Sequence, residues 1–230
     1  MRKPFVLVML ILACALTGCG HSYHWTQSHP DYRQVPYGDL AIAGTENAFV
    51  LTRAAWFAKK LEISTDSVQL KVTSFCEQVF LDELKRAYPS FTRISKEIHK
   101  AFPEESQKLD DRIFLKGHIP EQGVIVKDSE GKIPPRILIL HEFFIGTDLK
   151  RELFFDYALI HNESADKKTS KNLSAVISYT LWDNEKQRPL FSAVDEVQKS
   201  IITPTMADME SLIRTSVQQI RKNMYAGVVR

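Results

Sequence analysis

Two runs of alternating residues near the C-terminal end of the chain constrain its fold most. From Leu173 to Leu181 every second residue is apolar, with serine and threonine at most of the positions between them. This pattern predicts a half-buried strand. The polar run 183–187 predicts a turn, and Leu190 to Val197 predicts the returning strand. Because so short a connection joins antiparallel strands, a hairpin with one apolar face is the predicted centre of the fold.

Two further stretches have apolar residues at helical spacing. The first covers residues 66–88 and ends before Pro89, with a strand over Val68 to Val72 as the alternative because several residues there are β-branched. The second follows Thr205, which forms a capping-box pattern with Asp208. The apolar stripes are Val68, Val72, Phe75, Val79 and Leu84, widened by Phe80, in the first helix and Met209, Ile213, Val217, Ile220 and Met224 in the second.

The order of the elements predicts the fold class. Short strands are expected at 91–94, 113–115 and 124–126, longer ones at 137–145 and 153–159 around a turn at 146–148, one or two helical turns at 95–102, and short strands with loop over 39–63. We therefore expect a single α+β domain over residues 39–230. It should have two layers, with a mostly antiparallel sheet covered on one face by two amphipathic helices.

The composition and net charge limit the classes of partner that the chain is expected to bind. Hydrophobic residues make up 44% of the chain and charged residues 25%, as in an ordinary globular protein. The formal charge of +2 includes Arg2 and Lys3, and removal of the first 18 residues would leave the side chains balanced. A neutral domain argues against nucleic acid as a partner and against electrostatic binding to anionic lipid.

The N-terminus has the layout of a secretory signal. Arg2 and Lys3 precede an apolar run from Phe5 to Ala15. This run is about eleven residues long, whereas a helix that crosses a bilayer needs about 20, so a removable signal over residues 1–18 is expected. The following Leu16-Thr17-Gly18-Cys19 resembles the lipobox of bacterial lipoproteins. That resemblance implies cleavage before Cys19 and acylation of this residue, with acyl chains that anchor the protein in a membrane.

The segment after the anchor is expected to be a tether. Residues 19–38 hold several aromatic residues and histidines but show no period, as a spacer requires. Loose metal binding by His21, His24 and His29 is the minor alternative, since these histidines lack a cysteine or carboxylate framework. With Cys14 removed and Cys19 acylated, only Cys76 remains, and its apolar surroundings predict a buried, unreactive thiol.

Parts of the chain also resemble a group of envelope proteins. The helix ending Phe-Leu-Asp-Glu-Leu-Lys-Arg-Ala-Tyr at 80–88, the strand 91–94, and the hairpin with Leu181-Trp182-Asp183 and Leu190-Phe191 are similar to lipoproteins of the curli-secretion-channel type. They are also similar to the amino-terminal domain of the Tol-system β-propeller protein. The resemblance covers roughly residues 66–225. It implies a scaffold or assembly role and no catalytic residues.

The chemistry-bearing residues form no recognised catalytic motif. The sequence has no Gly-x-Ser-x-Gly, no phosphate-binding glycine loop and no zinc-protease spacing after His141-Glu142. We interpret His141 as a core or edge histidine, and no metal or cofactor is expected. An enzyme that uses His141, Glu142 or Asp156 is the least favoured hypothesis, because no nucleophile and base stand at a suitable spacing.

Aromatic residues are the better functional lead. Phe143, Phe144, Phe154 and Phe155 gather around one predicted turn, two on each sheet face, and one helix layer covers only one face. Either residues 39–63 cover the other face, or these four residues form a contact surface for a partner.

The sequence therefore predicts a non-catalytic, membrane-anchored envelope lipoprotein. It would act as a scaffold or as an accessory in assembly or transport, through contact with an envelope protein. The alternative is an auxiliary lipoprotein of an envelope transporter that binds lipid or a small ligand. Assembly into a homo-oligomer is a further possibility that the sequence does not decide. Gly20 stands where an inner-membrane retention signal would place Asp, so we expect the outer membrane and an orientation towards the periplasm.

Overall fold

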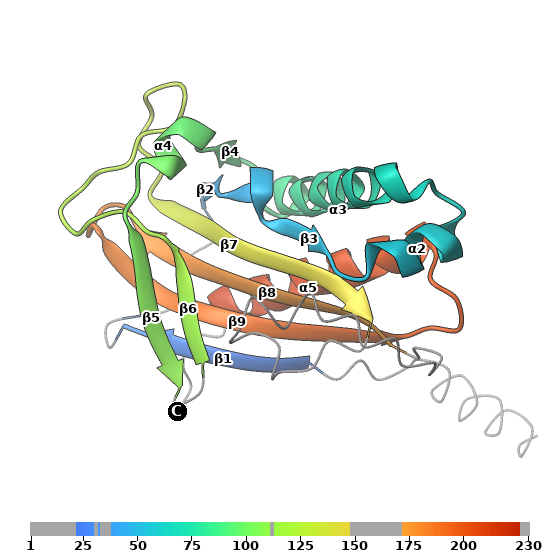
Figure 1. The fold of residues 1–230 in the computed structure, drawn as a ribbon. Coiled ribbons are helices and arrows are strands. Elements are labelled where there is room, and N and C mark those ends of the chain that lie inside the picture. Colours follow the sequence, from blue (N-terminus) through green and yellow to red (C-terminus); the bar gives the residue numbers. More distant parts are fainter. Residues whose placement is uncertain (1–21, 30–31, 33–37, 111–112, 148–171, 226–230) are drawn as a thin grey trace, which may run out of the picture.

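The computed structural model describes residues 22–29, 32, 38–110, 113–147 and 172–225. The elements are β1 (Ser22–Ser28), β2 (Leu40–Ala43), η1 (Thr45–Asn47), β3 (Phe49–Leu51), α2 (Ala54–Leu61), α3 (Thr65–Ala87), β4 (Thr92–Arg93), α4 (Lys96–Lys100), β5 (Glu104–Asp110), β6 (Ile113–His118), β7 (Arg136–Thr147), β8 (Asn172–Asp183), β9 (Arg188–Ser200) and α5 (Met206–Tyr225). Within these ranges the chain forms a mixed seven-stranded sheet with helices α2, α3 and α5 on one face and a two-stranded ribbon on the other (Figure 1).

The predicted α+β class and the helix-covered sheet are confirmed. The strand order is β1-β9-β8-β7-β2-β4, with β3 also paired to β7. Strands β1, β9, β8 and β7 pair with one another antiparallel, whereas β2 and β3 pair with β7 in parallel and β4 pairs with β2 in parallel. The predicted hairpin is β8–β9, and α3 and α5 are the two predicted amphipathic helices.

Helices α3 and α5 bury their apolar stripes against the sheet. In α3 the buried line runs through Cys76, while Phe75 and Val79 lie at its margin. In α5 all five predicted stripe residues are buried, and Thr205 and Asp208 exchange the expected capping hydrogen bonds. Arg214 of α5 pairs with Glu83 of α3, which joins the two helices. Among the described residues, no helix is both long and apolar enough to cross a membrane.

Several local predictions need correction. Residues 22–28 belong to the expected tether, yet they form β1 and pair with β9, because the edge of β9 offers unpaired backbone groups. Residues 146–147 continue β7 instead of turning. Residues 124–126 are loop, and the predicted strand 153–159 lies outside the described residues. Within 39–63 the sequence pattern missed helix α2.

A bulge in β7 decides which residues face the helices. The register against β8 shifts between Leu140 and Glu142, so that His141 has no direct partner in the ladder. Before the bulge Leu138 and Leu140 face the main core, and after it Phe143 and Ile145 do. The extra residue therefore allows the even-numbered residues before the bulge and the odd-numbered residues after it to lie on the same face of the sheet.

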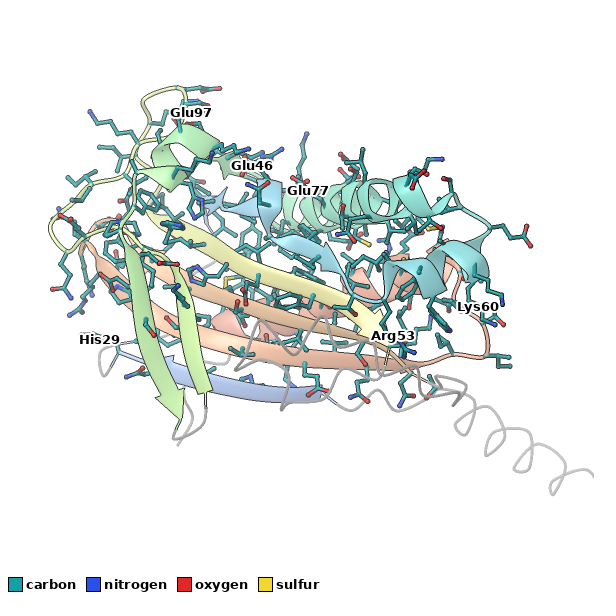
Figure 2. The ribbon with its side chains drawn as sticks, viewed as in Figure 1. His29, Glu46, Arg53, Lys60, Glu77 and Glu97 are labelled. Atoms are coloured by element: carbon teal, nitrogen blue, oxygen red, sulfur yellow. The ribbon has the colours of Figure 1, made fainter. Side chains whose placement is uncertain are left out.

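The interruption between β2 and β3 lies next to this bulge. Gly44 has a φ of 84°, and a Cβ there would lie 2.2 Å from the backbone oxygen of Leu140. Only glycine allows this approach. The 3-10 turn η1 that follows is tied to α3 through Arg93, which pairs with Glu46 at 3.6 Å and with Glu77 at 3.3 Å. Glu46 and Glu77 accordingly lie near each other in Figure 2.

Candidate functional site

The predicted aromatic contact surface is not exposed in the described structure. Phe143 is fully buried, stacked on Phe49 with ring centroids 4.7 Å apart and edge-on to Phe80. Phe144 is also buried, with 4% of its surface exposed. The prediction of an open patch is therefore wrong for these two residues. For Phe143 the physical reason is the cover from residues 39–63 that the sequence left open, because β3 pairs with β7 and places Phe49 on it. Phe154 and Phe155 lie outside the described residues, as does Cys19.

Exposed apolar side chains gather instead on the connection between β6 and β7, which we call the 119–135 loop. Val124, Ile125 and Ile133 are 41%, 48% and 52% exposed. Among the described residues the other large apolar side chains with such exposure are those of Leu70, on α3, and Ile202, on the connection between β9 and α5. An exposed apolar cluster on one loop is typical of an interaction site.

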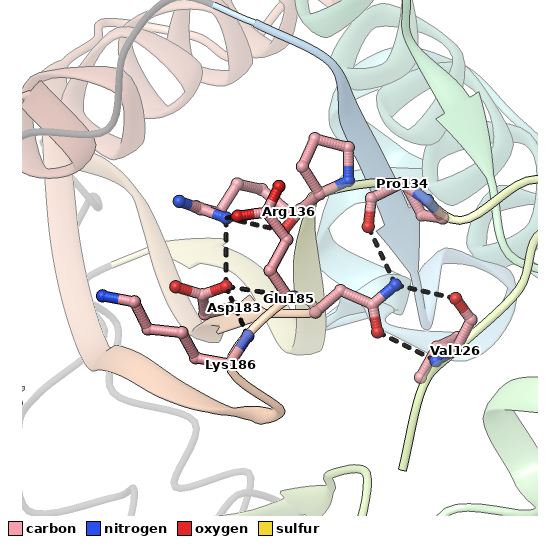
Figure 3. Close-up of polar contacts among 8 residues, drawn as sticks. Val126, Pro134, Arg136, Asp183, Glu185 and Lys186 are labelled. Carbon is pink, nitrogen blue, oxygen red and sulfur yellow. Dashed lines mark hydrogen bonds and ion pairs between the residues drawn. The ribbon is translucent and has the colours of Figure 1, made fainter. Parts of the chain in front are cut away.

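A buried asparagine clamps this loop to the end of the sheet. The side-chain oxygen of Asn184 accepts a hydrogen bond from Val126 N at 2.8 Å, and its amide nitrogen donates to Val126 O at 2.7 Å and to Pro134 O at 2.8 Å. Figure 3 shows these bonds reaching both limbs of the loop. Since Ile125 and Ile133 directly precede the clamped residues, the clamp holds the two exposed side chains on neighbouring limbs.

The tip of the loop has its own hydrogen bonds. The carboxylate of Asp128 is buried and accepts from the backbone N–H groups of Glu130 and Lys132, both at 2.9 Å. The N–H of Asp128 donates to Lys132 O at 2.9 Å, and Gly131 supplies the positive φ of 79° that the turn requires. The loop is thus a defined structure with an exposed apolar surface.

The turn beside the clamp is fixed by an ion pair. Arg136 donates to Asp183 at 3.0 Å, and the same carboxylate oxygen accepts from the backbone N–H groups of Glu185 and Lys186 (Figure 3). Asp183 is 1% exposed. This arrangement orders the predicted polar turn and keeps Asn184 in place.

A second, smaller core lies under the loop. It joins α4, β6 and the loop to one end of the sheet, on the face opposite the main helices. Its buried members are Ala41, Ala43, Ile94, Phe102, Leu115, Ile119, Val126, Ile137, Ile139 and Trp182. We call α4, residues 115–118 of β6 and the 119–135 loop together the cap.

Three histidines lie between the cap and the sheet. His141, the bulged residue of β7, contacts Thr180 Oγ1 through Nε2 at 3.0 Å, and Thr180 in turn bonds Ser192 at 2.9 Å. Its Nδ1 is buried and has no hydrogen-bond partner in the described structure. Gly117 of β6 packs directly on this ring, because a Cβ there would lie 2.0 Å from Nδ1. The predicted core histidine is therefore satisfied at one nitrogen only.

The other two histidines belong to the cap itself. The ring centroids of His99 in α4 and His118 in β6 are 5.7 Å apart. His118 Nδ1 donates to Phe102 O at 2.8 Å, whereas the buried Nε2 of His99 has no partner in the part of the chain that is described. Burial, reinforced by His118, lowers the pKa of His99. Burial, reinforced by His99 and His118, lowers the pKa of His141 from 6.5 to about 3.

Within the part of the chain that is described, these groups do not assemble a metal centre. Among the described residues, no three histidine, cysteine or acidic side chains are placed to hold a metal ion. Burial raises the pKa of Glu142, and Lys116 of β6 partly offsets this shift. Asp156 lies outside the described residues. The thiol of Cys76 is buried, and burial raises its pKa to about 12.

A polar network on the helix face was missed by the sequence analysis. The fully buried carboxylate of Asp195 accepts hydrogen bonds from Tyr179 Oη at 2.7 Å and from Asn223 Nδ2 at 2.9 Å. His24 of β1 lies 3.3 Å from the same carboxylate. Burial and the charge of Asp195 raise the pKa of Tyr179 well above its usual value. This network joins β1, β8, β9 and α5.

Comparison with known proteins gives no family. No protein-family model matches the chain, and no curated protein matches it. Among solved structures, the PelC dodecamer from Paraburkholderia phytofirmans is similar at 8% identity, over 90% of this chain and 99% of that chain, with a TM-score of 0.40. A PDZ domain protein from Parabacteroides distasonis is similar at 10% identity, over 97% of this chain and 41% of that chain, with a TM-score of 0.33. Both scores are too low to establish a shared fold.

Proposed function

We propose that the protein is a non-catalytic envelope lipoprotein, anchored through acyl chains on Cys19, that binds another envelope protein through the 119–135 loop. The observation that carries this proposal is the exposure of Val124, Ile125 and Ile133 on a loop that buried hydrogen bonds hold in place. A pre-organised apolar surface binds with little loss of conformational entropy, which is a common property of docking loops.

The position of the loop favours a protein partner over lipid. Ser22 begins β1, three residues after Cys19, and pairs with Val197. The clamp at Asn184 lies just before β9 begins at Arg188. From Val197 back to Arg188 the strand spans about 30 Å at about 3.3 Å per residue. The exposed loop therefore lies at the far end of the sheet from Ser22, the first described residue after the proposed anchor.

In-cell crosslinking of the full, acylated chain tests the docking site. A photoreactive amino acid is placed at Ile125 and, as a matched control, at Leu70, which is an exposed apolar residue on α3. We expect recurrent adducts with one envelope protein from position 125 and none from position 70. The same adducts should disappear when Val124, Ile125 and Ile133 are all replaced by serine and the probe is moved to Lys127, while Leu70→Ser should retain them.

Other outcomes of the same experiment separate the alternatives. If the triple serine variant folds and keeps every adduct, the loop is not the docking site. Adducts with phospholipid, together with lipid extracted from the purified protein, would favour the lipid-binding alternative. Adducts between copies of this chain would favour a homo-oligomer.

The anchor and its location need a separate test. Cys19→Ala should release the protein from the membrane fraction, and mass spectrometry of the N-terminal peptide should lose the mass of the acyl chains. Fractionation of the acylated form is expected to place it in the outer membrane, and resistance to protease added to intact cells would indicate that it faces the periplasm.

A further inference from the structure

We propose that the cap is an acid-sensitive element, which separates from β7 when the imidazoles of His99 and His141 take up protons. The acid-induced opening does not depend on the proposed function. Only its consequence for partner binding rests on that function, because the cap carries the 119–135 loop. Its basis is the convergence of three titratable rings in the interface between the cap and the sheet.

The packing around His141 leaves no room for a solvated imidazolium. Its Nδ1 faces the backbone of Gly117 and has no acceptor in the described structure. A proton at this nitrogen would create a buried charge without a hydrogen bond, which is strongly unfavourable in a protein interior. Withdrawal of β6 exposes the ring to water and removes that cost. Protonation therefore favours the open arrangement.

The ring pair in the cap acts in the same direction. A proton on His99 would place a positive charge beside the ring of His118, whose centroid is 5.7 Å away, and would repel a charge on His141. The unpartnered Nε2 of His99 offers no compensating contact. A second positive charge in this interface would therefore add to the unfavourable effect of the first.

The charged groups that face the cluster offset this effect only in part. From η1, Glu46 raises the pKa of His99, but this carboxylate is already paired with Arg93. From β7, Glu142 is itself buried with a raised pKa, so it takes up a proton at a higher pH than an exposed glutamate. From β6, Lys116 adds a positive charge, which Glu104 pairs at 3.0 Å.

The sign and the size of the effect follow from proton linkage. A histidine whose pKa is about 3 in the closed cap and about 6.5 in the open cap stabilises the closed form fully above pH 7. This contribution is lost progressively as the pH falls from 6.5 towards 3, because only the open form takes up the proton in this range. Between pH 7 and pH 5, His141 alone should increase the open population about 25-fold. The lowered pKa of His99 acts with the same sign.

Hydrogen exchange of backbone amides measures this opening without any partner. In the wild-type protein, amides of α4 and of residues 115–118 should open about 25-fold more often at pH 5 than at pH 7, after correction for the intrinsic exchange rate. His141→Gln keeps a group that can bond Thr180 but does not titrate, so it should lose most of this pH dependence. His29→Gln, outside the cap, is the control and should retain it.

The outcomes are decisive in each direction. Equal opening at pH 5 and pH 7, or a pH dependence unchanged in His141→Gln, overturns the proposal. If His141→Gln opens the cap at both pH values, NMR titration of the wild-type ring decides: a midpoint below pH 5 supports the proposal, and one near 6.5 refutes it. Because crosslinking at pH 7 tests the docking loop alone, failure of that function leaves this measurement unaffected.

Discussion

Replacement of Asn184 by alanine should detach the 119–135 loop while leaving the sheet intact. The side chain makes three buried hydrogen bonds, and its removal leaves Val126 N, Val126 O and Pro134 O without their partners. A buried hydrogen bond contributes about 1 kcal/mol, and an orphaned buried group costs about 1–3 kcal/mol. Allowing for water that enters the loosened site, we expect a loss of about 3 kcal/mol, on the order of 100-fold in the attached population.

Hydrogen exchange at the Val126 amide reads this change directly, because that amide donates to Asn184. Its protection should fall on the order of 100-fold, while amides in the β8–β9 ladder keep theirs. Lys186→Ala, in the same turn but with an exposed side chain, is the matched control and should leave protection unchanged. Asn184→Asp should resemble the alanine variant, since a carboxylate would face two carbonyl oxygens. Wild-type protection at Val126 in both Asn184 variants would refute the clamp.

Three further predictions test the core and the cap. Cys76 should react with a thiol reagent only when the protein unfolds, because burial raises its pKa to about 12, and fast labelling of the native protein would contradict its burial. Gly117→Ala should destabilise the cap by about 1–3 kcal/mol through the clash with His141, measured as lost protection of β6 amides, and unchanged protection would exclude the close packing. Asn223→Leu should cost about 2–4 kcal/mol in urea unfolding, since it strips donors from the buried Asp195, and Asn223→Asp, which sets a second carboxylate against it, should cost at least as much.

The elements that the sequence predicts well have a periodic pattern of their own. Helix α3, helix α5 and the β8–β9 hairpin each show which face is buried without reference to any other segment. Their boundaries agree with the structure within a few residues, because Pro89 and the Thr205 capping box mark helix ends locally. The α+β class follows from these elements alone.

The features that the sequence analysis missed depend on contacts between distant segments. Strand β1 exists because β9 has a free edge, and residues 22–28 have no strand pattern strong enough to announce it. The bulge at His141 lies between two apolar runs, 137–140 and 143–145, and the polar pair His141-Glu142 that separates them does not by itself show that the parity changes. The exposed Ile125 resembles a strand residue by type. Only the clamp from Asn184, about sixty residues further along the chain, makes it a loop residue.

The pairing of the first described strand with the last has a consequence for how the chain folds. Ser22 lies beside Val197, so the outermost ladder closes a loop that contains almost the whole domain. Closure of so long a loop carries a large entropic cost. Contacts with the rest of the fold offset this cost only after β8, β9 and α5 are in place, so β1 should dock late in folding. A chain still emerging from its point of synthesis or translocation would keep the edge of β9 open until its final residues arrive. The segment next to the proposed anchor is therefore expected to be the last to become ordered.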